Sequence, residues 1–175
     1  MTNQYCLSRP HINGRWTWNW YDIWDITIDE INNYEYWEME FIKMQLSVYD
    51  YFSRNKACIV TYGVNYELKY LESQVISKSE INSDLKSLLN ITNNGIDKIS
   101  RDEMKFLFKS AIRGYCHISL VDLSFNSRLV PTDEGMNYYL YLENELDLEE
   151  IHIPQTIQVE FLGTESFYVG EGFDS

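Results

Sequence analysis

The sequence feature that most constrains the fold is a run of apolar residues at intervals of three and four. The run comprises Ile31, Tyr34, Trp37, Phe41, Met44, Val48 and Phe52. This spacing places the side chains on one face of an α-helix. The segment Thr27-Ile28-Asp29-Glu30 fits a capping box, in which Thr27 caps the first turn and Glu30 reaches back to it. We therefore predict one long helix that ends near Arg54.

The flanking segments favour strands. Tryptophan at alternate positions predicts a strand over 15–23, which could extend to Ile28 through a bulge. Whether the tryptophans at 16–24 lie in the core or on the surface stays open. The β-branched segment 57–62 predicts a central strand, and the alternating segment 65–76 predicts its hairpin partner.

Two shorter helices and a second group of strands follow. One helix is expected from Ser77 to about Leu89. The other follows a capping box at Ser100 and continues to Ile112, with Gly114 as the residue that ends it. Further strands are predicted at 115–123, 137–142, 156–162 and, as an edge, 167–169. Consecutive strands favour antiparallel pairing. We therefore predict an α+β fold, with an antiparallel sheet of about five to seven strands, one long N-terminal helix and two shorter central helices.

Length and composition indicate a single domain over residues 1–175. With 175 residues, of which 45% are hydrophobic, the chain can bury a core without metals or disulfides. No apolar run is long enough to span a bilayer, and the N-terminus lacks the apolar region of a secretory signal. The cysteines are odd in number and far apart, which favours reduced thiols. We expect a cytoplasmic protein that does not bind membranes.

Charge is distributed unevenly along the chain, whose net charge is −13. Residues 1–42 carry −5, residues 43–128 carry +3, and residues 129–175 carry −11 with no Lys or Arg. Because each phosphate contact needs a cation, this charge argues against binding to nucleic acid. Two interpretations stay open. The acids could coat solvated faces, as we expect for those on the long helix, or they could form a binding face whose self-repulsion a basic partner relieves.

No motif for catalysis or for a cofactor is present. The three histidines lack the spacing of a helical zinc site. Cys116 and His117 are adjacent in a predicted strand, so their side chains would point to opposite faces, which argues against a nucleophile–base pair. Segment 143–147 imitates the start of an EF-hand loop but is followed by Leu148 where the loop needs glycine. We therefore expect no enzymatic activity, no cofactor and no bound metal.

In size, charge and lack of a catalytic motif, the chain resembles small acidic bacterial immunity proteins, including those of contact-dependent inhibition systems. The resemblance covers no defined motif, and it implies nothing about the fold. It implies an inhibitor that neutralises a basic partner, such as a toxin or a nuclease domain. Complementary charge would speed association, and aromatic anchors would slow dissociation.

The hypothesis places the partner-binding residues mainly in the C-terminal part of the chain. Their carboxylates would pair with Arg and Lys of the partner in the positions that phosphates would take. It also predicts that acids from both ends of the chain converge on one surface. The first choice is Glu143, Glu145, Asp147, Glu149 and Glu150, with Asp133 and Glu134 nearby, and the second is Asp22, Asp25 and Asp29 with Trp24.

Two alternatives belong to other functional classes. A small enzyme could assemble a motif-less active site from scattered residues, which predicts a deep pocket with a carboxylate or histidine of shifted pKa. A module that binds a small ligand or a carbohydrate would instead expose tryptophan side chains on one face of the sheet.

Overall fold

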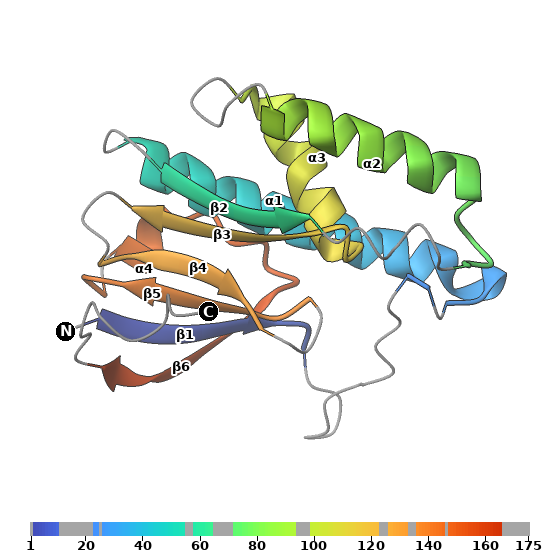
Figure 1. The fold of residues 1–175 in the computed structure, drawn as a ribbon. Helices are drawn as coiled ribbons and strands as arrows, with labels where there is room; N and C mark the ends of the chain where they lie inside the picture. Colours follow the sequence, from blue (N-terminus) through green and yellow to red (C-terminus); the bar gives the residue numbers. More distant parts are fainter. Residues whose placement is uncertain are drawn as a thin grey trace.

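The computed structural model describes residues 2–10, 23–24, 26–54, 58–64, 72–93, 99–122, 126–132, 136–145 and 147–165 (Figure 1). Within these residues the chain forms strands on both sides of a helical middle section. The elements are β1 (Thr2–Ser8), a 3₁₀ turn η1 (Ile28–Glu30), α1 (Ile31–Arg54), β2 (Cys58–Val64), α2 (Lys78–Asn93), α3 (Arg101–Ile112), β3 (Cys116–Asp122), β4 (Arg128–Pro131), β5 (Tyr138–Leu142), α4 (Asp147–Glu150) and β6 (Gln158–Glu165).

The six strands form one antiparallel sheet with the order β2-β3-β4-β5-β1-β6. The N-terminal strand β1 lies between β5 and β6, so that Leu7 is paired with Tyr138 on one side and with Val159 on the other. The predicted α+β fold with an antiparallel sheet is confirmed. The central position predicted for segment 57–62 is wrong, because β2 is an edge strand of the described sheet and pairs there with β3.

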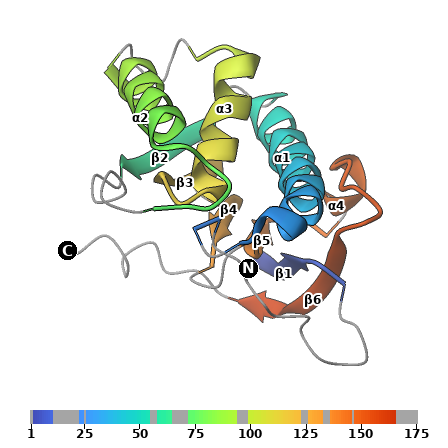
Figure 2. The same ribbon diagram turned by 90° about the vertical axis from the view of Figure 1, so that its right-hand side faces the viewer.

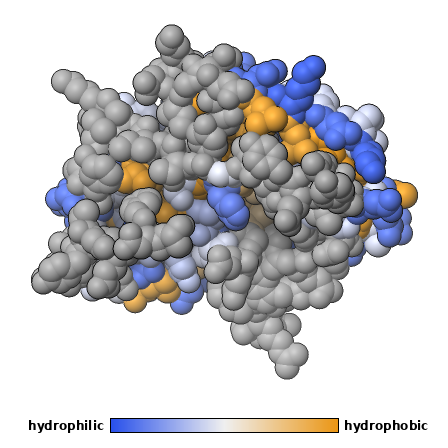
Figure 3. Space-filling view, viewed as in Figure 1, coloured by the Kyte–Doolittle hydropathy of each residue, from blue (hydrophilic) through white to orange (hydrophobic). Residues whose placement is uncertain are grey.

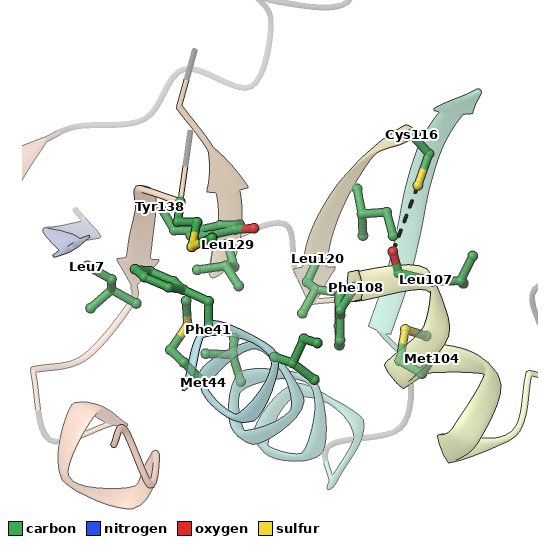
Figure 4. Close-up of a cluster of buried hydrophobic side chains, with 14 of the residues drawn as sticks. Leu7, Phe41, Met44, Met104, Leu107, Phe108, Cys116, Leu120, Leu129 and Tyr138 are labelled. Atoms are coloured by element: carbon green, nitrogen blue, oxygen red, sulfur yellow. Dashed lines mark hydrogen bonds between the residues drawn. The ribbon is translucent and has the colours of Figure 1, made fainter. Parts of the chain in front are cut away.

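The long helix α1 lies across one face of the sheet because its apolar stripe needs cover (Figures 1 and 2). Phe41 and Met44 are fully buried, and the ring of Phe41 lies 5.9 Å from that of Tyr138 on β5. Figure 4 shows Leu7 and Leu129 from two other strands beside this pair. Burying each large apolar side chain contributes about 1.5–3 kcal/mol. The core continues along α3 through Met104, Leu107 and Phe108.

Capping interactions fix the ends of the helices as the sequence predicts. Glu30 accepts a hydrogen bond from the backbone N–H of Thr27 at 2.9 Å, which confirms the first capping box. Ser100 and Glu103 cap α3 reciprocally, at 2.7 Å and 3.3 Å. At the other end of α3, Gly114 has φ +76, a left-handed conformation that favours glycine.

Helix α2 is amphipathic and forms the outermost layer. It buries Ile81 and Leu88. In Figure 3 hydrophilic side chains follow its outer edge and hydrophobic ones lie on its inner side. Within the described ranges, no helix is both long enough and apolar enough to cross a membrane.

Some elements differ from the sequence-based expectation. β1, β4 and the short helix α4 were not predicted. Ile23 and Trp24 form a turn, and η1 follows, so the strand expected from 15–23 does not extend to Ile28. Residues 72–76 are irregular rather than part of a strand. The rest of the expected strands at 15–23 and 65–76, and all of 167–169, lie outside the described residues.

Candidate functional site

Five carboxylates gather where the chain leaves β5 and forms α4. We call Glu143, Glu145, Asp147, Glu149 and Glu150 the acidic surface. Asp147 is half-buried and the other four side chains are exposed. They lie at the end of the sheet where β1 begins, because Leu142 at the end of β5 is paired with Asn3. The structure therefore brings the first-choice residues together on one short, exposed segment.

The local fold of this segment explains why its acids face outwards. The Asp147 carboxylate accepts a hydrogen bond from the backbone N–H of Asn144 at 3.3 Å, and the Asp147 N–H donates to the Asn144 carbonyl at 3.2 Å, which fixes the turn that leads into α4. Leu148 and Ile151, three residues apart, lie on the same side of this turn and pack into the core. The intervening Glu149 and Glu150 remain in solvent. Anchoring by two apolar residues thus holds the acids at the surface.

The acids of the acidic surface have no ion-pair partner among the described residues. None of the five takes part in an ion pair with another described residue; the described pairs are Lys43–Glu40, Arg101–Asp50, Arg113–Glu38 and Arg113–Glu80. The cause lies in the sequence, because residues 129–175 contain no Lys or Arg. The nearby Arg128 on β4 stacks over the ring of Tyr141 at 4.2 Å, on the sheet face opposite to α1.

Two tyrosines from distant parts of the chain adjoin the acidic surface. Burial, followed by the neighbouring Asp147 carboxylate and the charge of Glu150, raises the pKa of Tyr51 on α1. Burial, with the charges of Glu145 and Asp147, also raises the pKa of Tyr5 on β1. The Tyr5 hydroxyl has no hydrogen-bond partner among the described residues. Phenol groups from two other segments therefore lie near these carboxylates, the one of Tyr5 buried and the one of Tyr51 half-buried.

Acids in the N-terminal part of α1 have a different role from the one expected. The sequence predicts that they lie on an exposed helix face, but Glu38 is 5% exposed and Glu40 is 7% exposed. Glu38 accepts two hydrogen bonds from the buried guanidinium of Arg113, at 2.5 and 3.1 Å. Glu40 accepts hydrogen bonds from Lys43 and Thr156, both at 2.5 Å. That prediction is wrong for both residues, which connect elements of the core.

The second-choice residues do not join the acidic surface. Asp29 is exposed in η1, at the start of α1, whereas Tyr51 beside Asp147 lies near the end of α1. The rise of an α-helix separates these two ends by about 30 Å. Trp24 is half-buried and packs on Tyr115, with ring centroids 5.9 Å apart. The predicted convergence of acids from both chain ends is therefore wrong for Asp29. Asp22, Asp25, Asp133 and Glu134 lie outside the described residues.

The described residues also allow a test of two alternatives, an enzymatic site and a metal site. Cys116 is buried and His117 is exposed, as expected for neighbours on a strand, and burial raises the pKa of the Cys116 thiol to about 12. Burial raises the pKa of the half-buried Asp84 on α2, which lies near Arg113. In the described part of the chain, no group of three or more His, Cys, Asp or Glu side chains could hold a metal ion.

Sequence reasoning found the carboxylates of the acidic surface but missed the tyrosines beside it. Tyr5 lies in a strand that was not predicted. Tyr51 lies one position before Phe52, the last residue of the apolar stripe, and no local pattern distinguishes it. Comparisons of the chain with protein-family models, curated proteins and solved structures found no match.

Proposed function

We propose that this chain is an acidic binding protein that neutralises a basic protein partner, in the manner of an immunity protein that inhibits a toxin or nuclease. The observation that carries the proposal is the acidic surface. Five carboxylates share one short segment, and none of them has a cationic partner among the described residues. Such an arrangement favours binding of an external cation, which relieves the mutual repulsion of the acids.

The electrostatics suit a protein partner with a basic cleft. The net charge of −13 attracts a basic partner over a distance set by the ionic strength. Complementary charge raises association rates towards about 10⁸–10⁹ M⁻¹s⁻¹. Carboxylates can accept paired hydrogen bonds from arginine, as phosphate groups do. The acidic surface is therefore suited to occupy the site at which a nuclease binds the phosphates of its substrate.

The surroundings of the acids suit a stable complex. Tyrosine supplies contact area with little loss of conformational entropy, and it is enriched among residues that dominate binding energy. Tyr51, half-buried on α1, flanks the acidic surface beside Asp147. Slow dissociation would follow from contacts of this kind, while the charges govern the rate of association.

The first experiment is co-purification from the source cell at low salt and at about 0.5 M salt, where exposed charges are largely screened. We expect one basic protein to be recovered at low salt, and we expect the purified chain to inhibit it at a stoichiometric ratio. The double variant Glu145→Lys with Glu149→Lys should weaken the measured affinity at least about tenfold, or about 1.4 kcal/mol.

A matched variant makes the same charge change elsewhere. Glu35 and Glu72 are both exposed and lie outside the acidic surface. The double variant Glu35→Lys with Glu72→Lys should change the affinity by less than about threefold, because long-range attraction alone contributes modestly to affinity. Equal losses in the two double variants would argue against a localised site. Recovery of no basic protein at either salt would contradict the proposed function.

A further inference from the structure

The edge strand β6 carries an unusual group of exposed apolar side chains. Phe161 is 56% exposed, Leu162 is 46% exposed and Val159 is 38% exposed. We call these three residues the β6 strip. Large apolar side chains that gather in one place on a surface commonly mark an interaction site. The strip lies on β6, which borders β1 on the side away from β5 and forms an edge of the described sheet (Figure 2).

The strand register places Phe161 and Val159 of the β6 strip on the same side of the sheet as α1. Phe161 is paired with Tyr5 and Val159 with Leu7, and paired residues point to the same face. Tyr5 and Leu7 belong to the core beneath α1. Phe161 and Val159 therefore continue this apolar face to the edge of the sheet, where both side chains are exposed. Leu162 lies at the bulge next to Phe161, where the register shifts.

The β6 strip and the acidic surface meet at Tyr5. The Tyr5 ring lies 5.5 Å from that of Phe161. Its strand partner on the other side is Leu140 of β5, which ends at Leu142 directly before the acidic surface. Tyr5 is 4% exposed, and its hydroxyl oxygen has no hydrogen-bond partner among the described residues. A buried polar atom of this kind generally acquires a partner. A donor from a bound partner would supply one.

We propose that the acidic surface and the β6 strip form one continuous docking surface for a segment of a basic protein, in which an apolar side chain is flanked by arginine or lysine. The apolar side chain packs on Phe161 and Val159. The flanking cations pair with Glu145, Asp147 and Glu149. This inference rests on the proposed function and specifies the chemistry of the partner at that site.

The negative charge of the docking surface determines which class of molecule can bind there. A second copy of this chain would bring its own five carboxylates towards the same surface, and the like charges would repel. A nucleic acid would be repelled in the same way. A purely apolar segment would leave the acids without partners, whereas a basic segment with an apolar residue satisfies both parts of the surface. Interfaces commonly combine an apolar centre with a charged rim in this way.

Two synthetic peptides separate the apolar contribution from the charge. The probes are Arg-Arg-Leu-Arg-Arg-Leu and Arg-Arg-Ser-Arg-Arg-Ser, which carry the same charge. Affinities are measured by NMR titration of the full chain at low salt, with amide shifts used to locate the peptide. We expect the leucine peptide to bind about five- to tenfold more tightly than the serine peptide. Amide shifts should include both 143–150 and 159–162.

Variants then test the β6 strip itself. Phe161→Ser should abolish the preference for the leucine peptide and leave binding of the serine peptide unchanged, whereas Phe161→Leu should keep the preference. Met39, which is 53% exposed on α1, provides the control: Met39→Ser should keep the preference. Thermal unfolding verifies that each variant is folded, and Val159→Ser replaces Phe161→Ser if that variant does not fold.

The outcomes distinguish this inference from the function on which it rests. If both peptides bind wild type equally, or if loss of the Phe161 and Val159 side chains preserves the preference, the β6 strip is not a docking surface, although the acidic surface still binds cations. If neither peptide binds at low salt, both proposals fail. Self-association of the chain that is lost in Phe161→Ser would assign the strip to a second copy instead and overturn the inference.

Discussion

Glu38 on α1 and Glu145 before α4 have the same side chain in opposite surroundings. Glu38 is buried, and the guanidinium of Arg113 satisfies its carboxylate at 2.5 Å. Glu145 is exposed and has no ion pair with any described residue. A buried charge must have a partner because desolvation is costly. An exposed charge without a partner remains available to another molecule. Acids of the first kind hold the fold together, and those of the second kind are candidates for binding.

The largest expected effect in this comparison comes from breaking the buried pair. Glu38→Gln should lower the free energy of unfolding by about 3–5 kcal/mol, because it leaves the buried guanidinium of Arg113 only the ion pair with the exposed Glu80, at 3.5 Å. Urea denaturation measures the loss. Glu35→Gln, on the exposed side of the same helix, should change stability by less than about 0.5 kcal/mol. Similar losses in the two variants would show that Glu38 is not buried in the way described.

Replacing both Glu38 and Arg113 tests whether the loss in Glu38→Gln comes from the unpaired charge. The double variant Glu38→Met with Arg113→Met removes both charges and keeps apolar volume in the core. Buried ion pairs can often be replaced by apolar residues without loss. We expect urea denaturation to give a stability within about 1–2 kcal/mol of wild type. A loss as large as the sum of the two single replacements would indicate that Arg113 has a further role.

A smaller effect is expected at Glu40, with a characteristic pH dependence. Hydrogen bonds from Lys43 and Thr156 hold the pKa of Glu40 below its usual value of 4.5. The unfolded chain therefore takes up this proton more readily, and the stabilisation is complete above pH 4.5 and lost as the pH falls through the lower folded-state value.

The variant Glu40→Gln tests this dependence. It should cost about 1–2 kcal/mol at pH 7, where the charged hydrogen bonds are present. Urea denaturation from pH 7 down to about pH 3 should show a shallower fall in stability for this variant than for wild type. Parallel pH profiles for the two proteins would mean that Glu40 does not contribute to the acid sensitivity of the fold.

The smallest expected effect, of opposite sign, is at the acidic surface. Glu145→Lys with Glu149→Lys should leave stability unchanged or raise it by up to about 1 kcal/mol at low salt, because it reduces repulsion between exposed acids. The difference from wild type should shrink at about 1 M salt. Thermal unfolding at the two salt concentrations measures it. A loss comparable to that of Glu38→Gln would place these acids in the fold rather than in binding.

Elements with strong local signals were predicted from the sequence. The apolar stripe located α1, and the capping box at Ser100 located the start of α3, because caps and helix faces depend on residues three or four positions apart. β1 was missed because Tyr5, Cys6 and Leu7 are buried in succession, which removes the alternation that identifies a strand with one covered face. β4 was missed because it has only four residues and ends in Pro131.

For the acids, too, some features follow from the sequence and others only from the tertiary structure. The sequence by itself determined that residues 129–175 contain no Lys or Arg, and hence that acids within this region have no lysine or arginine of the same region to pair with. Only the tertiary structure decided that Glu38 and Glu40 are buried, because their partners Arg113 and Thr156 lie 75 and 116 positions away. It also placed Tyr5 and Tyr51 beside the acidic surface. The reason is physical: capping acts between neighbours in sequence, whereas desolvation and charge pairing depend on distance in space, which the packing of α1 on the sheet sets.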